Sequence, residues 1–259
     1  GIAYLNFYLE EDADKENILR DVRNALEELR TFMDIGEATI EESQTEDKDW
    51  INNWKEFFHQ FYVDDILIVP SWEEVKEEDK DKMILHIDPG TAFGTGMHET
   101  TQLVIRQLKK YVTRGAEILD VGTGSGILGI TALKLGAGHV VGTDLDPCAV
   151  SAVQDNKEAN QIEDDSFDMM IGNIIDDVEV QNEVGYERYD IVAANILADV
   201  LVPLTPVIVH QMKKGAYYIT SGILDVKEEV VREAVEKAGL TLVEVTKQGE
   251  WVCVTARKD

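Results

Sequence analysis

Residues 117–132 constrain the fold more than any other stretch of this sequence. A run of strand length, residues 117–121, leads directly into Gly122, Gly124 and Gly126. Apolar residues at helical spacing follow, at Ile127, Leu128, Ile130 and Leu133. This order predicts a strand, a tight turn and a helix. Because glycine has no side chain and the N–H groups at a helix start are unpaired, the turn is suited to an anionic or electron-rich ligand.

The glycine turn has two interpretations when it is taken alone. Gly124, Gly126 and Gly129 satisfy the dinucleotide-binding pattern, and Asp144 lies about twenty residues further on, where that pattern has an acid for the ribose. The same residues are also compatible with a purely structural turn between a strand and a helix. Other parts of the chain must decide between the two.

Strands and helices are predicted to alternate through the C-terminal part of the chain. After the first strand, further strands are predicted at residues 139–144, 167–172, 189–194, 216–220, 240–246 and 250–256. Such alternation predicts a parallel sheet with helices on both faces and a ligand at the carboxyl ends of the strands. The last two strands are separated by Lys247, Gln248 and Gly249 alone, which leaves no room for a crossover helix. One terminal strand must therefore run antiparallel.

Two further features place polar groups near that sheet edge. Residues 83–88 predict a strand, and a loop rich in glycine and threonine follows, ahead of a helix that has Glu99 near its start. Glycines ahead of a helix N-terminus again indicate a ligand-binding loop. The strand at 189–194 delivers Asn195 to the same edge, where its amide would face a ligand or would cap the next helix.

The chain is predicted to contain two domains joined by a linker. Aromatic residues gather between positions 50 and 62, which favours packing at a domain junction over a substrate groove. A charge run at 73–82 suits a solvated segment. The predicted division is a small α+β domain at residues 1–63, a linker at 64–82 and a larger domain at 83–259.

The predicted small domain has few elements. An apolar alternation at residues 3–10 predicts a strand, and helical spacing from Lys15 to Phe32 predicts a helix with acidic residues ahead of it. Residues 38–42 are compatible with a second strand.

The net charge of the chain indicates which classes of macromolecule it can bind. The formal charge is -27 at pH 7, and no basic run is visible, so direct nucleic-acid binding is disfavoured. A basic protein partner fits better. High net charge also has a simpler explanation, because it keeps a protein dispersed and monomeric, and we expect a monomer.

Composition gives further expectations about metals and compartment. The two cysteines and five histidines show no metal-ligand or disulfide spacing, so no structural metal is expected. No apolar run is long enough to span a membrane, and the first residues lack signal-peptide order. We therefore expect a cytoplasmic protein without a membrane partner.

Taken together, these features resemble the class I methyltransferases that use S-adenosylmethionine. More specifically, the motif at residues 90–101, the glycine turn at 122–128 and the run Asn195-Ile-Leu-Ala198 resemble the ribosomal-protein methyltransferases of the PrmA type, which modify the large-subunit protein numbered eleven. The resemblance covers residues from about 84 to the end. It implies an α/β fold with a Rossmann-like seven-stranded sheet whose last strand is antiparallel. A small ferredoxin-like α+β domain would precede this sheet in the sequence.

The resemblance also implies roles for particular residues. It places Asn195 at the reacting amine, as the catalytic residue. It assigns S-adenosylmethionine to a site lined by Thr101, Asp120, Gly122, Gly124, Asp144 and Asn195, with Phe93 and Gly94 from the threonine-rich loop and Ile174 beside the adenine. The substrate would be a basic ribosomal protein, methylated on lysine side chains, the N-terminal α-amine or both.

Three points stay open at this stage. The opening strand and helix of the family's small domain have no counterpart in residues 1–63, so either this branch differs or the domain is incomplete here. An NAD-dependent oxidoreductase would use the same Gly124-to-Gly129 pattern. A methyltransferase for another substrate is also an alternative. One that acts on glutamine or adenine would be expected to carry prolines after Asn195.

Overall fold

A computed structural model describes residues 14–32, 35–36, 38–40, 59–88 and 96–259. The chain divides into two compact units, Gly1–Asp49 and Trp50–Asp259. In the first unit, helix α1 spans Lys15–Arg30, close to the predicted helix. Its N-cap is Asp14, which accepts a hydrogen bond from Asn17 N (3.1 Å). The strand predicted at 3–10 lies outside the described residues.

The core of the second unit is a seven-stranded sheet with the order β6-β5-β4-β7-β8-β10-β9. Only β10 runs opposite to the other six strands of this sheet, which confirms the predicted reversal. A two-residue turn joins β9 to β10, and Gly249 has φ +58° there. The strands are β4 Glu117–Val121, β5 His139–Asp144, β6 Phe167–Ile171, β7 Tyr189–Asn195, β8 Met212–Leu224, β9 Leu240–Gln248 and β10 Trp251–Lys258.

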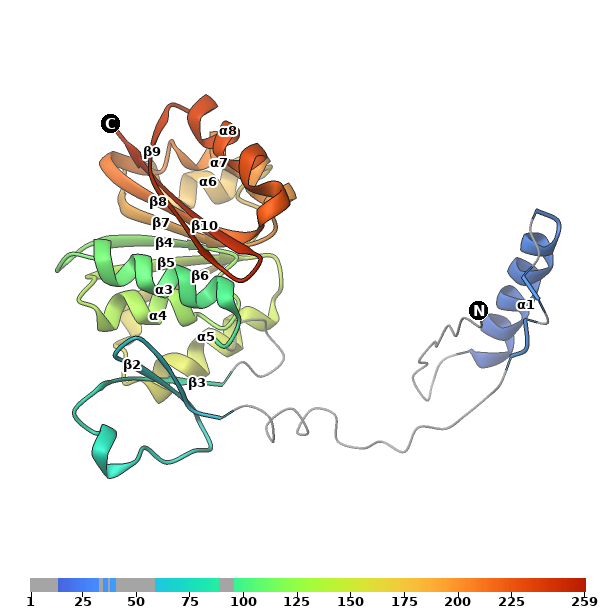
Figure 1. Cartoon of the computed structure of the whole chain (residues 1–259), viewed down its shortest axis with the longest axis horizontal. Helices are drawn as coiled ribbons and strands as arrows, with labels where there is room; N and C mark the ends of the chain where they lie inside the picture. The colour runs from blue at the N-terminus through green and yellow to red at the C-terminus, as the bar shows by residue number, and fades with distance from the viewer. Residues whose placement is uncertain (1–13, 33–34, 37, 41–58, 89–95) are drawn as a thin grey trace. The chain divides into compact units, whose positions relative to one another are not determined.

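Helices cover both faces of this sheet (Figure 1). One face carries α3 Glu99–Tyr111, α4 Ile127–Lys134 and α5 Cys148–Ala159, and the other carries α6 Val178–Val184, α7 Ala198–Ile208 and α8 Glu228–Lys237. Each face has its own buried apolar cluster. The strand order reverses at β4, between β5 and β7. Ligand sites of open α/β sheets form at this reversal.

A smaller sheet packs on the α3–α5 side. It has the order β1-β2-β3, with β1 at Phe61–Val63, β2 at Ile66–Pro70 and β3 at Met83–Ile87. All residues of β2 are buried, and β2 pairs in parallel with β3. The sequence predicted a solvated linker over 64–82, but residues 66–70 form a buried strand instead. An unbroken apolar run of this kind is typical of a strand covered on both faces. The role predicted for residues 1–63 in substrate recognition stays a prediction.

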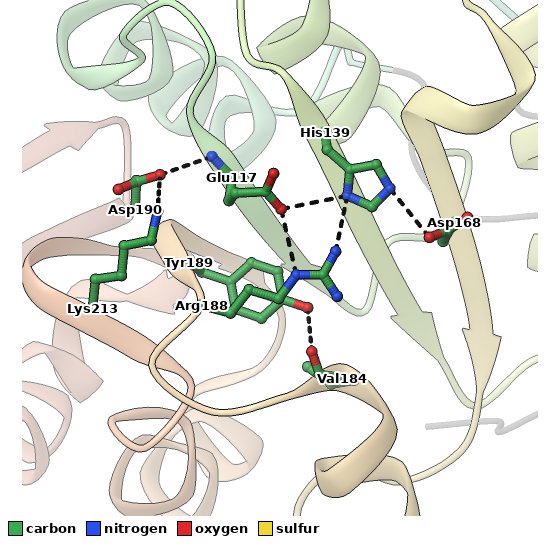
Figure 2. A network of polar contacts seen from close by, with 8 residues as sticks. All are labelled: Glu117, His139, Asp168, Val184, Arg188, Tyr189, Asp190 and Lys213. Carbon is green, nitrogen blue, oxygen red and sulfur yellow. Dashed lines mark hydrogen bonds and ion pairs between the residues drawn. The ribbon is translucent and has the colours of Figure 1, made fainter.

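Charged side chains connect the amino ends of the strands (Figure 2). His139 Nε2 lies 3.1 Å from Asp168 Oδ2, and His139 Nδ1 lies 3.6 Å from Glu117 Oε2. Arg188 Nε lies 3.4 Å from the same Glu117 oxygen. Asp190 accepts a hydrogen bond from the Glu117 backbone N–H (2.9 Å). We call these five residues the amino-edge network, and they join β4, β5, β6 and β7.

In the described ranges, no helix has both the length and the hydropathy needed to cross a membrane.

Candidate functional site

The glycine turn lies at the carboxyl end of β4 and depends on glycine. Gly122, Gly124 and Gly126 have φ values of +70°, +53° and +79°. A Cβ at Gly122 would lie 2.6 Å from Cγ2 of Ile196, so side chains are excluded there by contact as well as by backbone conformation. Gly122 and Gly124 are partly exposed. The turn therefore offers bare backbone at the edge of the sheet.

Asp120 lies underneath this turn. Its side chain is fully buried, and Oδ2 accepts hydrogen bonds from Thr123 Oγ1 (2.7 Å) and Gly129 N (3.1 Å). Burial, with a smaller contribution from nearby Asp144, raises the pKa of Asp120 to about 6. Oδ1 has no hydrogen-bond partner in the described part of the chain. In this structure Asp120 therefore links Thr123, in the turn, to Gly129, in the first turn of α4.

Asp144 closes β5 beside the turn. Its Oδ2 accepts a hydrogen bond from Gly124 N (2.8 Å), and Oδ1 accepts one from Asp146 N (3.0 Å). The residue is half-buried. An ionised carboxylate has about four acceptor positions, so both oxygens can accept further bonds from a ligand's hydroxyl groups.

Asn195 and Thr101 meet at the same edge from β7 and α3. Asn195 Nδ2 donates to Thr101 Oγ1 (3.1 Å), and Thr101 is buried. The Asn195 Oδ1 atom is buried and has no partner within the described ranges. Buried acceptors are usually paired, so this oxygen is a candidate to accept a hydrogen bond from a ligand. The capping alternative is wrong, because the N-cap of α7 is Leu197 and no side chain caps that helix.

The remaining predicted site residues are Ile174, Phe93 and Gly94. Ile174 follows β6 and belongs to the same buried cluster as Val121 and Val180. Its segment adjoins Asp144, whose carbonyl oxygen accepts a hydrogen bond from Gly172 N (2.9 Å). Phe93 and Gly94 lie outside the described residues.

Sequence reasoning missed two asparagines, Asn156 on α5 and Asn160 at its C-cap. Both are buried. Asn160 binds the backbone of His86 in β3, and Asn156 binds the backbone of Asp88, the residue after β3. A signal was available, because two asparagines four positions apart lie on one face of a helix and buried amides need partners. Apolar periodicity alone does not reveal such polar residues.

The assembled site can bind and orient a ligand. Thr101, the glycine turn, Asp144 and Asn195 come from four separate segments and meet at the edge where the strand order reverses. No group of three His, Cys, Asp or Glu residues suited to a metal occurs in the described part of the chain. Hydroxyl, amide and backbone groups dominate the site.

Comparison with known sequences gives a family match. Residues 3–259 match the family model described as "Ribosomal protein L11 methyltransferase (PrmA)". A protein of that name from Agathobacter rectalis is 54% identical over 262 residues, covering 100% of this chain and 81% of the relative. The protein of that name from Lachnospira eligens is 56% identical over 259 residues, with the same coverage.

Solved structures agree at the level of the fold. The crystal structure of ribosomal protein L11 methylase from Lactobacillus delbrueckii subsp. bulgaricus is 31% identical, with a TM-score of 0.69 over 78% of this chain and 100% of that chain. SMU.776, described as a putative methyltransferase complexed with SAH, is 11% identical, with a TM-score of 0.55 over 74% of this chain and 69% of that one. The second likeness concerns the fold alone.

Proposed function

The chain belongs to the ribosomal protein L11 methyltransferase (PrmA) family, and from this premise we propose that Asn195 orients an amine of ribosomal protein L11 for methylation. The chain is an S-adenosylmethionine-dependent methyltransferase. The observation that carries the proposed role is the buried Oδ1 of Asn195, which has no hydrogen-bond partner among the described residues, while the bond from Nδ2 to Thr101 orients the amide. The family match decides against the dinucleotide interpretation of the glycine turn.

The residues at the sheet edge fit this cofactor. Asp144 would accept the ribose hydroxyls with the lone pairs that the Gly124 and Asp146 amides leave free. The glycine turn would allow the cofactor to approach the backbone, and Thr101 would border it. Ile174 would lie near the adenine. Phe93 and Gly94 keep the roles that the family motif implies.

The chemistry requires orientation more than acid or base catalysis. When bound, S-adenosylmethionine supplies a methyl group activated by a sulfonium. An amine must be neutral to attack it, and this is easier for an α-amine with a pKa of about 8 than for a lysine near 10.4, unless burial lowers the latter. Asn195 Oδ1 would accept a hydrogen bond from the amine and align its lone pair. The methylated amine then loses a proton to solvent before another transfer.

The substrate class follows from the family and the charge. We propose that L11 is a basic partner that presents lysine side chains, its α-amine or both. The charge of -27 would attract such a protein before it docks. Labelling L11 with isotopic cofactor and locating the label by mass spectrometry identifies the amines and the number of methyl groups.

Two substitutions separate the proposed roles of Asn195 and Asp144. We expect Asn195→Ala to lower kcat by about a hundredfold or more, the scale of a lost positioning group, and to keep cofactor affinity. We expect Asp144→Ala to lose cofactor affinity first. The measurements are calorimetric titration with S-adenosylmethionine and methyl transfer to L11. Unchanged activity in both variants would refute these assignments.

A further inference from the structure

Asn156 joins the end of β3 to the glycine turn through three hydrogen bonds. Its side chain is fully buried on α5, which lies beside β3 (Figure 1). Oδ1 accepts from Asp88 N (2.8 Å), and Nδ2 donates to Asp88 O (2.9 Å). The second Nδ2 hydrogen goes to Ser125 O (2.9 Å). One amide thus uses both donors and its acceptor on backbone groups that are 37 residues apart along the chain.

Asn160 makes a matching set of bonds one helical turn later. Its Oδ1 accepts from His86 N (2.9 Å), and its Nδ2 donates to His86 O (2.6 Å). Its remaining donor bond goes to Asn156 O (2.8 Å), in the helix that Asn160 caps. The two asparagines therefore hold β3 in the same way. Of the two asparagines, Asn156 alone also bonds to the glycine turn within the described residues.

Ser125 is the residue through which Asn156 contacts the glycine turn. It lies between Gly124 and Gly126, and it is completely buried, whereas Gly124 is partly exposed. Glycines lose more conformational freedom than other residues when they are ordered, so a turn built from them needs outside constraints to keep one shape. A hydrogen bond to the carbonyl of Ser125 fixes the peptide plane between Ser125 and Gly126. The neighbouring backbone of the partly exposed Gly124 then keeps a constant direction.

We propose that Asn156 is a positioning residue for S-adenosylmethionine, acting through the Ser125 carbonyl on the shape of the glycine turn. The inference rests on the cofactor named above and concerns the turn that would hold it. Without Asn156, the turn samples other shapes, and the cofactor must reorder it on binding. This ordering cost lowers affinity without any loss of a direct contact.

Replacement of each asparagine by alanine tests the proposal. We expect Asn156→Ala to weaken S-adenosylmethionine binding by about fivefold to tenfold, the effect of roughly 1 kcal/mol for one lost hydrogen bond. Asn160→Ala is the matched control, since it removes the same clamp on β3, and we expect its Kd to stay within about twofold of the wild type. Both variants should have a lower Tm, because Asn156→Ala removes two hydrogen bonds to the backbone of Asp88 and Asn160→Ala removes two to the backbone of His86. Isothermal titration and thermal unfolding measure these quantities.

Each outcome of this comparison is informative. Equal losses of affinity in the two variants would assign the effect to β3 in general and overturn the proposal. Wild-type affinity in a folded Asn156→Ala protein would overturn it as well. Failure of the wild type itself to bind S-adenosylmethionine would count against the proposed function and not only against this inference.

Hydrogen exchange on the wild type tests the same link if Asn156→Ala does not fold. The Asp88 amide donates to Asn156, and the His86 amide donates to Asn160. We expect added S-adenosylmethionine to slow exchange at Asp88 more than at His86, since only Asn156 is tied to the turn. Unchanged exchange at Asp88, or equal slowing at both amides, would contradict the proposal.

Discussion

At the scale of single residues, Asp120 makes stability depend on pH. Burial raises its pKa from 3.8 to about 6, so the folded protein binds this proton more tightly than the unfolded chain does. The free energy of unfolding should therefore fall as the pH rises from about 4 to 6, by an amount of the order of 3 kcal/mol at most. Asp120→Asn keeps an acceptor for Thr123 and Gly129 and removes this titration. Urea unfolding across that pH range, compared between the two proteins, measures the difference. Parallel pH profiles would show that Asp120 does not titrate there.

At the scale of elements, the amino-edge network should stabilise the sheet without affecting the chemistry at the opposite edge. Arg188→Met keeps an apolar stem and removes the cation that faces Glu117. Arg188 is 39% exposed and partly screened by water, so we expect a loss of about 1 kcal/mol, or roughly 2–4 °C in Tm. Methyl transfer should be unchanged.

Arg232→Met provides the matched control for this prediction. Arg232 is 34% exposed, and its two carboxylate partners, Glu228 and Glu229, lie on its own helix. Pairs of this kind contribute only about 0.3–0.5 kcal/mol, so a smaller fall in Tm is expected. High salt should reduce the difference between the two variants. Equal falls in Tm would mean that links between strands add nothing beyond a local pair.

At the scale of the whole molecule, charge should govern the capture of L11. Raising the ionic strength from about 0.01 M to 0.15 M shortens the Debye length from roughly 30 Å to 8 Å, which screens a charge of -27 from a basic partner. We expect KM for L11 to rise severalfold over this range, while kcat at saturating L11 stays constant. Steady-state kinetics at several salt concentrations measure both. An uncharged osmolyte is the control, and a KM that does not respond to salt would remove the charge-based account of substrate capture.

Much of the large domain could be predicted because its signals are local. Apolar periodicity predicted all seven strands of the central sheet, and the short connection after β9 predicted the reversal of β10. By contrast, the pairing of β2 with β3 was not predicted, because it joins segments separated by a charge run. Helix α6 was also missed, since it spans only Val178–Val184.

The candidate site could likewise be predicted only in part from the sequence. Residue types and spacing identified the glycine turn, Asp144 and Asn195, and strand polarity placed them at one edge. Spacing could not show that Asn195 directs its amide nitrogen at Thr101, or that its oxygen has no partner in the described part of the chain. Nor could it show that Asn156 reaches Asp88 and Ser125. Such side-chain contacts depend on how α3, α5 and the strands pack.

Local sequence patterns were enough to predict the order of the strands along the chain, the glycine turn and the types of side chain at the carboxyl edge. These properties follow from periodicity and backbone preference, which act over a few residues. Packing in three dimensions was needed to show which oxygen at that edge has no partner among the described residues, and which buried amide bonds to the turn. A hydrogen bond between distant segments forms only where packing brings donor and acceptor within about 3 Å.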